Sequence, residues 1–147
     1  MKKLLVIAAL CLSAYAIYYF NADVLDQFGP PPVQVSTHDN LIGRAYRNHQ
    51  NNLQVQGVGR VISILPDDHK GRRHQRFIIE LASGQTLLIA HNIDLAPRIS
   101  ALAKGDTVEF YGEYEWNEKG GVIHWTHHDP DGRHEDGWLI HRRKKYS

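Results

Sequence analysis

The sequence predicts a mainly β domain, a small closed barrel of five strands with one short helix between the third and fourth strands. Segments rich in β-branched and aromatic residues alternate apolar and polar side chains with a period of two. Clusters of Gly, Asn and Ser separate these segments at the short spacing of hairpins. Gly57 and Gly59 stand in the middle of the first long strand, where a strand that bends around a small barrel needs a bulge or a sharp coil.

The first twenty residues have a different character from the rest of the chain. Lys2 and Lys3 precede an uncharged apolar run over residues 4–20, which is typical of a secretory signal or a membrane anchor. Ala14-Tyr15-Ala16 fits a cleavage site, but the apolar run continues to Phe20 and would reach about 25 Å as a helix, enough for a thin bilayer. We expect residues 1–20 to be an uncleaved anchor, with a cleaved signal as the alternative. The two lysines favour an orientation in which the N-terminus stays inside and the rest of the chain is carried across the membrane.

Composition sets limits on the exported part. The single cysteine, Cys11, lies inside the apolar run, so the part that follows forms no disulfide. The formal net charge of +1 gives no reason to expect a nucleic-acid partner from overall charge. Local charge is uneven, because residues 69–74 and 141–145 are basic whereas residues 106–115 are acidic.

Residues 21–36 contain Gly29-Pro30-Pro31-Pro32, which cannot continue a helix and favours polyproline geometry. We interpret this segment as a spacer between the membrane and the domain. Residues 37–50 predict a short helix, which Thr37 or Asp39 can cap. Its apolar stripe consists of Leu41, Ile42, Ala45, Tyr46 and His49. The barrel is expected over residues 51–141, and the basic residues 142–147 are expected to be a tail.

The first three strands are expected over residues 53–65, 76–81 and 85–91, the last two forming a hairpin around Ser83-Gly84. With a two-residue turn, Arg76 would face His91. Residues 92–103 contain a proline and a short apolar pattern, and residues 96–102 are the expected helix.

The last hairpin is expected over residues 106–115 and 121–128, around a turn at 117–120. If Trp116 pairs with Gly121, then Glu113 lies opposite His124, Glu109 lies opposite His128, and Gly112 faces Trp125. The core face would consist of Phe110, Gly112, Tyr114, Ile123, Trp125 and His127.

This order of strands and helix is that of the oligonucleotide/oligosaccharide-binding (OB) barrel, and KGDTVEFYGEYEWNEKGGVIHW resembles the last two strands of bacterial members of that fold. A closer resemblance covers about residues 53–141. The strings RHQRFIIELASGQTLLIAHNIDLAP, GDTVEFYGEYEWN and GGVIHWTHHDPDGRHEDGW resemble a family of short bacterial proteins known as a domain of unknown function. The resemblance implies an OB-like barrel and no particular activity. With the predicted anchor, it implies a protein of the bacterial inner membrane whose domain faces the periplasm or the cell exterior, or a periplasmic protein if the signal is cleaved.

In an OB barrel the third strand usually runs parallel to the fifth, which would bring polar residues of three strands to one end. The candidate ligand-binding residues are His74, Arg76, His91, His124, Trp125, His127 and His128. The alternative is a hydrogen-bonded polar patch without a ligand. The pair Glu113 and His124 is expected to be a surface ion pair rather than an acid/base pair.

A metal site is the more specific hypothesis. His127, His128, Asp129 and His134 are the candidate ligands, because zinc and other divalent transition metals bind these residue types. Residues four apart on a regular strand are about 13 Å apart, so a turn at residues 129–132 would have to fold His134 back. The alternative is that these side chains only cap the turn. Standard zinc spacings such as HExxH are not present in the sequence.

We expect a non-enzymatic binding module for an anionic or polar ligand, tethered to the inner membrane. Basic loop residues such as Lys70 and Arg72 suit an anionic polymer, and aromatic residues such as Tyr111 and Trp116 suit stacking on bases or sugars. Nucleic acid is not the favoured partner, because exported domains more often meet glycans, peptides, lipids or metal ions. The alternatives are a metal-dependent hydrolase of the nuclease or phosphodiesterase type that uses residues 127–134, and an interaction protein whose histidines are structural.

Overall fold

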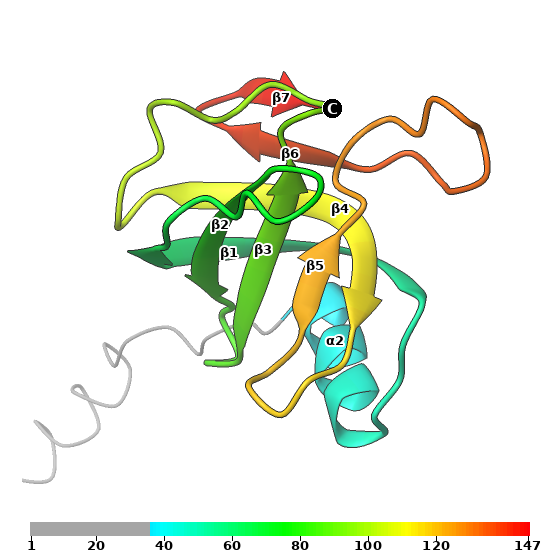
Figure 1. Ribbon diagram of the computed structural model, residues 1–147. Coiled ribbons are helices and arrows are strands. Elements are labelled where there is room, and N and C mark those ends of the chain that lie inside the picture. Colours follow the sequence, from blue (N-terminus) through cyan, green and yellow to red (C-terminus); the bar gives the residue numbers. More distant parts are fainter. Residues whose placement is uncertain (1–35) are drawn as a thin grey trace, which may run out of the picture. The chain divides into compact units, whose positions relative to one another are not determined.

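The computed structural model describes residues 36–147 (Figure 1). The predicted anchor at residues 1–20, and the spacer up to residue 35, lie outside the described residues. Within residues 36–147, no helix is long and apolar enough to cross a membrane. The described elements are α2 (Thr37–Arg47), β1 (Leu53–Ile64), β2 (His74–Glu80), β3 (Thr86–Asn92), β4 (Thr107–Glu115), β5 (Val122–His124), β6 (Trp138–His141) and β7 (Lys144–Tyr146).

Five of the strands close into a barrel, as the sequence predicts. The strands are hydrogen-bonded in the order β1-β2-β3-β5-β4, and a further pairing of β1 with β4 closes the ring. The β3–β5 pair is parallel, and the other neighbours in the ring are antiparallel. This arrangement is consistent with the predicted OB-like barrel.

The barrel interior is filled by every second residue of its strands. Burial alternates along β2 and β4, so that Phe77, Phe110 and Tyr114 are fully buried. Gly57 gives Phe110 its space, because a Cβ at position 57 would lie 2.5 Å from the ring. The predicted irregularity of β1 is a shift in register between Val61 and Ser63, a few residues beyond the two glycines.

Helix α2 packs against the core and the turn between β4 and β5 (Figure 1). Ser36 caps its first turn, because the side chain accepts the backbone N–H of Asp39 at 3.0 Å. Ile42 and Ala45 are fully buried, and the Tyr46 hydroxyl donates to the carbonyl oxygen of Glu118. The helix begins where the sequence predicts and ends at Arg47, short of residue 50.

The helix predicted over residues 96–102 is wrong. Residues 93–103 form turns without a helix, and a buried side chain satisfies part of their backbone. The Gln75 amide nitrogen donates to the carbonyl oxygen of Ile99 at 3.0 Å, and the Ile99 N–H donates to the Gln75 amide oxygen at 2.8 Å. Because this paired contact fixes the segment from outside, the segment does not need a helical ladder.

The predicted register of the second hairpin is also wrong, by one residue. Gln75 faces His91 and Arg76 faces Ala90, because the loop holds three residues instead of two. The Leu81 N–H donates to the carbonyl oxygen of Gln85, and Gly84 has a φ of +83°, which is the geometry of a three-residue hairpin with Gly in the left-handed position. The shift places Arg76 and His91 on opposite faces of the sheet.

The register of the last barrel hairpin is confirmed, since Glu113 pairs with His124. Strand β5 nevertheless ends there, because Trp125 has a φ of +50° and turns the chain away from the ladder. Thr126 therefore takes the position predicted for the indole, with its methyl group 2.8 Å from where a Cβ of Gly112 would lie. Glu109 faces Ile140 instead of His128.

A further hairpin, β6–β7, extends the sheet beyond the barrel (Figure 1). Strand β6 pairs with β4 over Val108–Tyr111, and β7 folds back onto β6. Residues 144–146, predicted to be part of a tail, form this last strand, and Tyr146 joins the core. Arg142 and Arg143 both have positive φ, as the two central residues of a tight I′ hairpin turn require.

Candidate functional site

A cleft of about 430 Å³ opens on the outer face of β2, β3 and β5. Because alternation turns Phe77 and Ile89 into the core, the neighbouring side chains face outward. The apolar lining residues are Leu88, Ala90 and Val122. The polar and aromatic ones are Asp68, His74, Arg76, Glu115, Trp116, Asn117 and His124. A cavity that combines apolar surface with convergent polar groups is typical of small-ligand sites.

Arg76 supplies a fixed positive charge to the cleft. Its Nε and one terminal nitrogen donate to the carbonyl oxygen of Pro66 at 3.1 and 3.0 Å, which holds the guanidinium against the β1–β2 loop. A guanidinium has five N–H donors, so donors remain for a ligand. Asp68 also lines the cleft, and the backbone N–H of Lys70 and, to a smaller extent, the charge of Arg76 lower the pKa of its carboxyl group. The ionised Asp68 carboxylate limits the net positive charge of the cleft.

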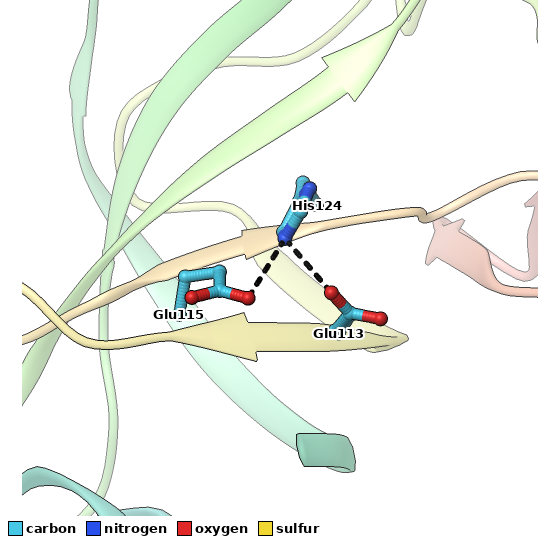
Figure 2. A group of neighbouring side chains, drawn as sticks. All are labelled: Glu113, Glu115 and His124. Carbon is cyan, nitrogen blue, oxygen red and sulfur yellow. Dashed lines mark ion pairs between the residues drawn. The ribbon is translucent and has the colours of Figure 1, made fainter. Parts of the chain in front are cut away.

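Glu113, Glu115 and His124 meet where β4 pairs with β5 (Figure 2). Glu115 and His124 also line the cleft itself. The His124 Nε2 atom is 3.5 Å from a Glu113 carboxylate oxygen and 4.0 Å from a Glu115 oxygen. These separations are long for hydrogen bonds, and the buried Nε2 atom makes none with the described residues. We call these three side chains the Glu/His cluster.

His124 is neutral at pH 7. Burial lowers the pKa of its imidazole, and this outweighs the opposite effect of the nearby Glu113 and Glu115 carboxylates. The predicted surface ion pair between Glu113 and His124 is therefore a contact between a carboxylate and a neutral ring at this pH. A neutral imidazole has one ring nitrogen free to accept a proton or bind a metal.

The loop over residues 125–137 folds back onto the Glu/His cluster. The Asp129 carboxylate accepts the backbone N–H groups of Asp131, Arg133 and His134 at 3.1, 2.7 and 2.9 Å, which organises the turn. The His134 ring stacks on Trp125 with a centroid separation of 3.8 Å, and its Nδ1 atom lies 3.4 Å from the second oxygen of Glu113. His134 is therefore a fourth polar side chain beside the Glu/His cluster.

Most of the candidate ligand residues come together. A cavity of about 140 Å³ adjoins the cleft and shares His74 and His124 with it. Trp125 and His127 line this second cavity, and Arg76 lines the cleft. The residues therefore come from β2, β5 and the loop after β5.

His91 and His128 do not line either cavity. The shifted register buries His91 completely, with its Nδ1 atom 2.8 Å from the Thr126 hydroxyl and its Nε2 atom 3.2 Å from the carbonyl oxygen of Pro97. His128 is exposed, and its Nδ1 atom is 2.7 Å from an Asp136 carboxylate oxygen.

The four predicted metal ligands do not surround one point. The His127 ring nitrogen contacts the carbonyl oxygen of His128 at 2.7 Å, His128 contacts Asp136, and His134 contacts Glu113. Asp129 caps the turn, as the alternative interpretation expects. Instead, the ligand atoms of Glu113, Glu115 and His124 all lie within 4.8 Å of one another, and His134 lies beside this group through its contact with Glu113.

Two members of this cluster, Glu113 and Glu115, are not among the ligand or metal candidates that the sequence predicts. A usable signal exists, because Glu113 and Glu115 are two apart on one strand and therefore share a face. The confirmed pairing of Glu113 with His124 puts the histidine beside both carboxylates.

Comparison with known proteins adds one finding. A family model described as "Protein of unknown function (DUF3465)" matches residues 26–147 of the chain, which includes every described element. No curated protein matches the chain.

Proposed function

The chain belongs to this DUF3465 family of proteins of unknown function, and from the cleft alone we propose that its domain is a non-enzymatic binding module for a small polar or anionic ligand. The observation that carries this proposal is the position of His74 and Arg76 beside the apolar residues Leu88 and Ala90 in one cleft of about 430 Å³. Clefts of this size hold small molecules. A guanidinium gives the paired donors that carboxylates and phosphates accept.

We expect the positive charge of Arg76 to be needed for anion binding. In the Arg76→Gln variant, inorganic phosphate titrated into the full-length chain should bind about 10- to 100-fold more weakly, as the loss of a charge-assisted hydrogen bond implies. Chemical-shift perturbation in NMR spectra measures the affinity and locates the bound ion.

The matched control is Arg60→Gln. Arg60 is an exposed β1 residue that pairs with Glu80 at 2.7 Å, so its loss changes the net charge equally and leaves the cleft intact. Equal weakening in both variants, or phosphate shifts that lie outside the cleft, would contradict the proposal.

We further propose that the module is held at the bacterial inner membrane by residues 1–20 and faces the periplasm or the cell exterior. The support is the apolar run that continues through Phe20 after Lys2 and Lys3. We expect the protein in the membrane fraction, resistant to high salt and released by detergent. Mass spectrometry that finds a mature protein beginning at Ile17 would replace the anchor with a cleaved signal.

Two other functions have narrower support. A metal-dependent hydrolase of the nuclease or phosphodiesterase type is favoured by the position of Glu115 and His124 in the cleft lining, although residues 127–134 do not form the predicted ligand set. An interaction protein with structural histidines is favoured by His91 and His141, which are buried and bonded to protein groups.

A further inference from the structure

We propose that Glu113, Glu115 and His124 (Figure 2) bind one divalent transition-metal ion, with zinc as the representative ion, beside the cleft that Glu115 and His124 line. His134 lies outside this group of three, but its Nδ1 atom is 3.4 Å from a Glu113 carboxylate oxygen, which makes it a candidate for a fourth ligand. This site differs in three of its four residues from the one that the sequence pattern around residues 127–134 suggests.

The spacing of the ligand atoms carries the inference. Zinc bonds nitrogen and oxygen at about 2.0–2.2 Å, so neighbouring ligand atoms of a tetrahedral site are separated by about 3.3–3.6 Å. The His124 Nε2 atom lies 3.5 Å from Glu113 and 4.0 Å from Glu115. The ligand atoms of all three side chains lie within 4.8 Å of one another, so side-chain rotations that bring them slightly closer would let them surround one ion.

Direct hydrogen bonds among the three side chains explain the Glu/His cluster less well than a bound ion does. The same separations are long for hydrogen bonds, and the Nε2 atom of His124 is buried without a hydrogen-bond partner among residues 36–147. In the same part of the chain, no Lys or Arg lies within salt-bridge distance of Glu113 or Glu115. Two carboxylates on one strand face, with histidines but no Lys or Arg beside them, favour a bound cation.

Neighbouring groups hold the ligands in place, as at established metal sites. The backbone N–H of Asn52 donates at 3.2 Å to the Glu115 oxygen that is nearest His124. Trp125 stacks on the ring of His134. Glu113, Glu115 and His124 themselves are on paired strands of the barrel, whose backbone is fixed by the ladder.

The ligand types decide the class of metal. Imidazole and carboxylate together suit zinc and similar transition ions, whereas calcium and magnesium prefer oxygen ligands alone. We therefore expect the site to discriminate against magnesium at equal concentration.

The test is a zinc titration of the full-length chain, purified without a histidine tag and followed by isothermal titration calorimetry. The wild type should bind one equivalent of zinc, and magnesium should not compete. The variants Glu115→Gln and His124→Gln should each weaken zinc binding more than about 10-fold. Circular dichroism checks that the variants are folded, and Glu115→Gln decides the question if His124→Gln is not, because it keeps the shape of a half-exposed side chain.

The matched control is His128→Gln, which removes an exposed histidine beside the carboxylate of Asp136 and should leave the affinity unchanged. If the wild type binds no zinc, or if Glu115→Gln binds as tightly as the wild type, the proposal is overturned. Equal loss in His128→Gln also overturns it, because it identifies adventitious binding to surface histidines. Arg76→Gln should retain zinc, so that failure of this site and failure of the anion-binding proposal are distinguishable.

Discussion

Replacement of Gly137 by alanine should lower the free energy of unfolding by about 3 kcal/mol or more, because the new methyl group has no space and its neighbours are backbone atoms. A Cβ at position 137 would lie 1.9 Å from the carbonyl oxygen of Trp125 and 2.6 Å from that of Tyr111. No rotamer relieves such contacts, so the loop must separate from β4. Chemical denaturation at neutral pH measures the loss.

The control is Gly43→Ala in α2. The nearest atom to a Cβ there is the flexible end of Arg47, at 3.4 Å, and alanine in a helix interior is better than glycine by about 0.5–1 kcal/mol. The two substitutions add the same methyl group and should change stability in opposite directions. Similar stability of Gly137→Ala and the wild type would show that the loop does not pack this closely against β4.

The domain should lose about 3 kcal/mol of stability between pH 6.5 and pH 4 through His91. Burial lowers the pKa of this histidine from 6.5 to about 4, and it outweighs the opposite effect of the contact with the carbonyl oxygen of Pro97. Because the unfolded chain binds a proton in this range and the folded chain does not, stability falls as the pH falls. The loss is complete below pH 4.

The effect of His91 can be distinguished from that of other titratable groups either by the pH range in which they act or by the His91→Gln substitution. The pKa of His124 is also lowered, so it contributes with the same sign. The pKa values of Asp106, Asp129 and Asp136 are lowered from 3.8, so these carboxylates lose their contribution at more acidic pH. Urea denaturation at several pH values should show a weaker pH dependence for His91→Gln than for the wild type and for His128→Gln. An unchanged dependence in His91→Gln would mean that His91 is not buried in its neutral form.

The sequence determined the architecture because alternation and turn chemistry are local. The closed five-stranded barrel follows from strands whose apolar residues alternate, and the β4–β5 register follows from the turn at residues 117–120. The family follows from the strings of residues themselves. The β2–β3 register did not follow, because Ile78 and Leu88 on the outer face are apolar as well, so the pattern does not choose between a two-residue and a three-residue loop.

Only the tertiary structure decided which polar residues meet. The pairing of Glu113 with His124 is visible in the sequence, but the end of β5 at Trp125, with its φ of +50°, depends on the loop that packs beside it through Gly137. That turn sends His127 and His128 in different directions and brings His134 to Glu113. Contacts of this kind join residues that are far apart along the chain, and a local pattern carries no information about the path of a loop between them. The sequence therefore supplied the residue types of the site, and the fold selected its members.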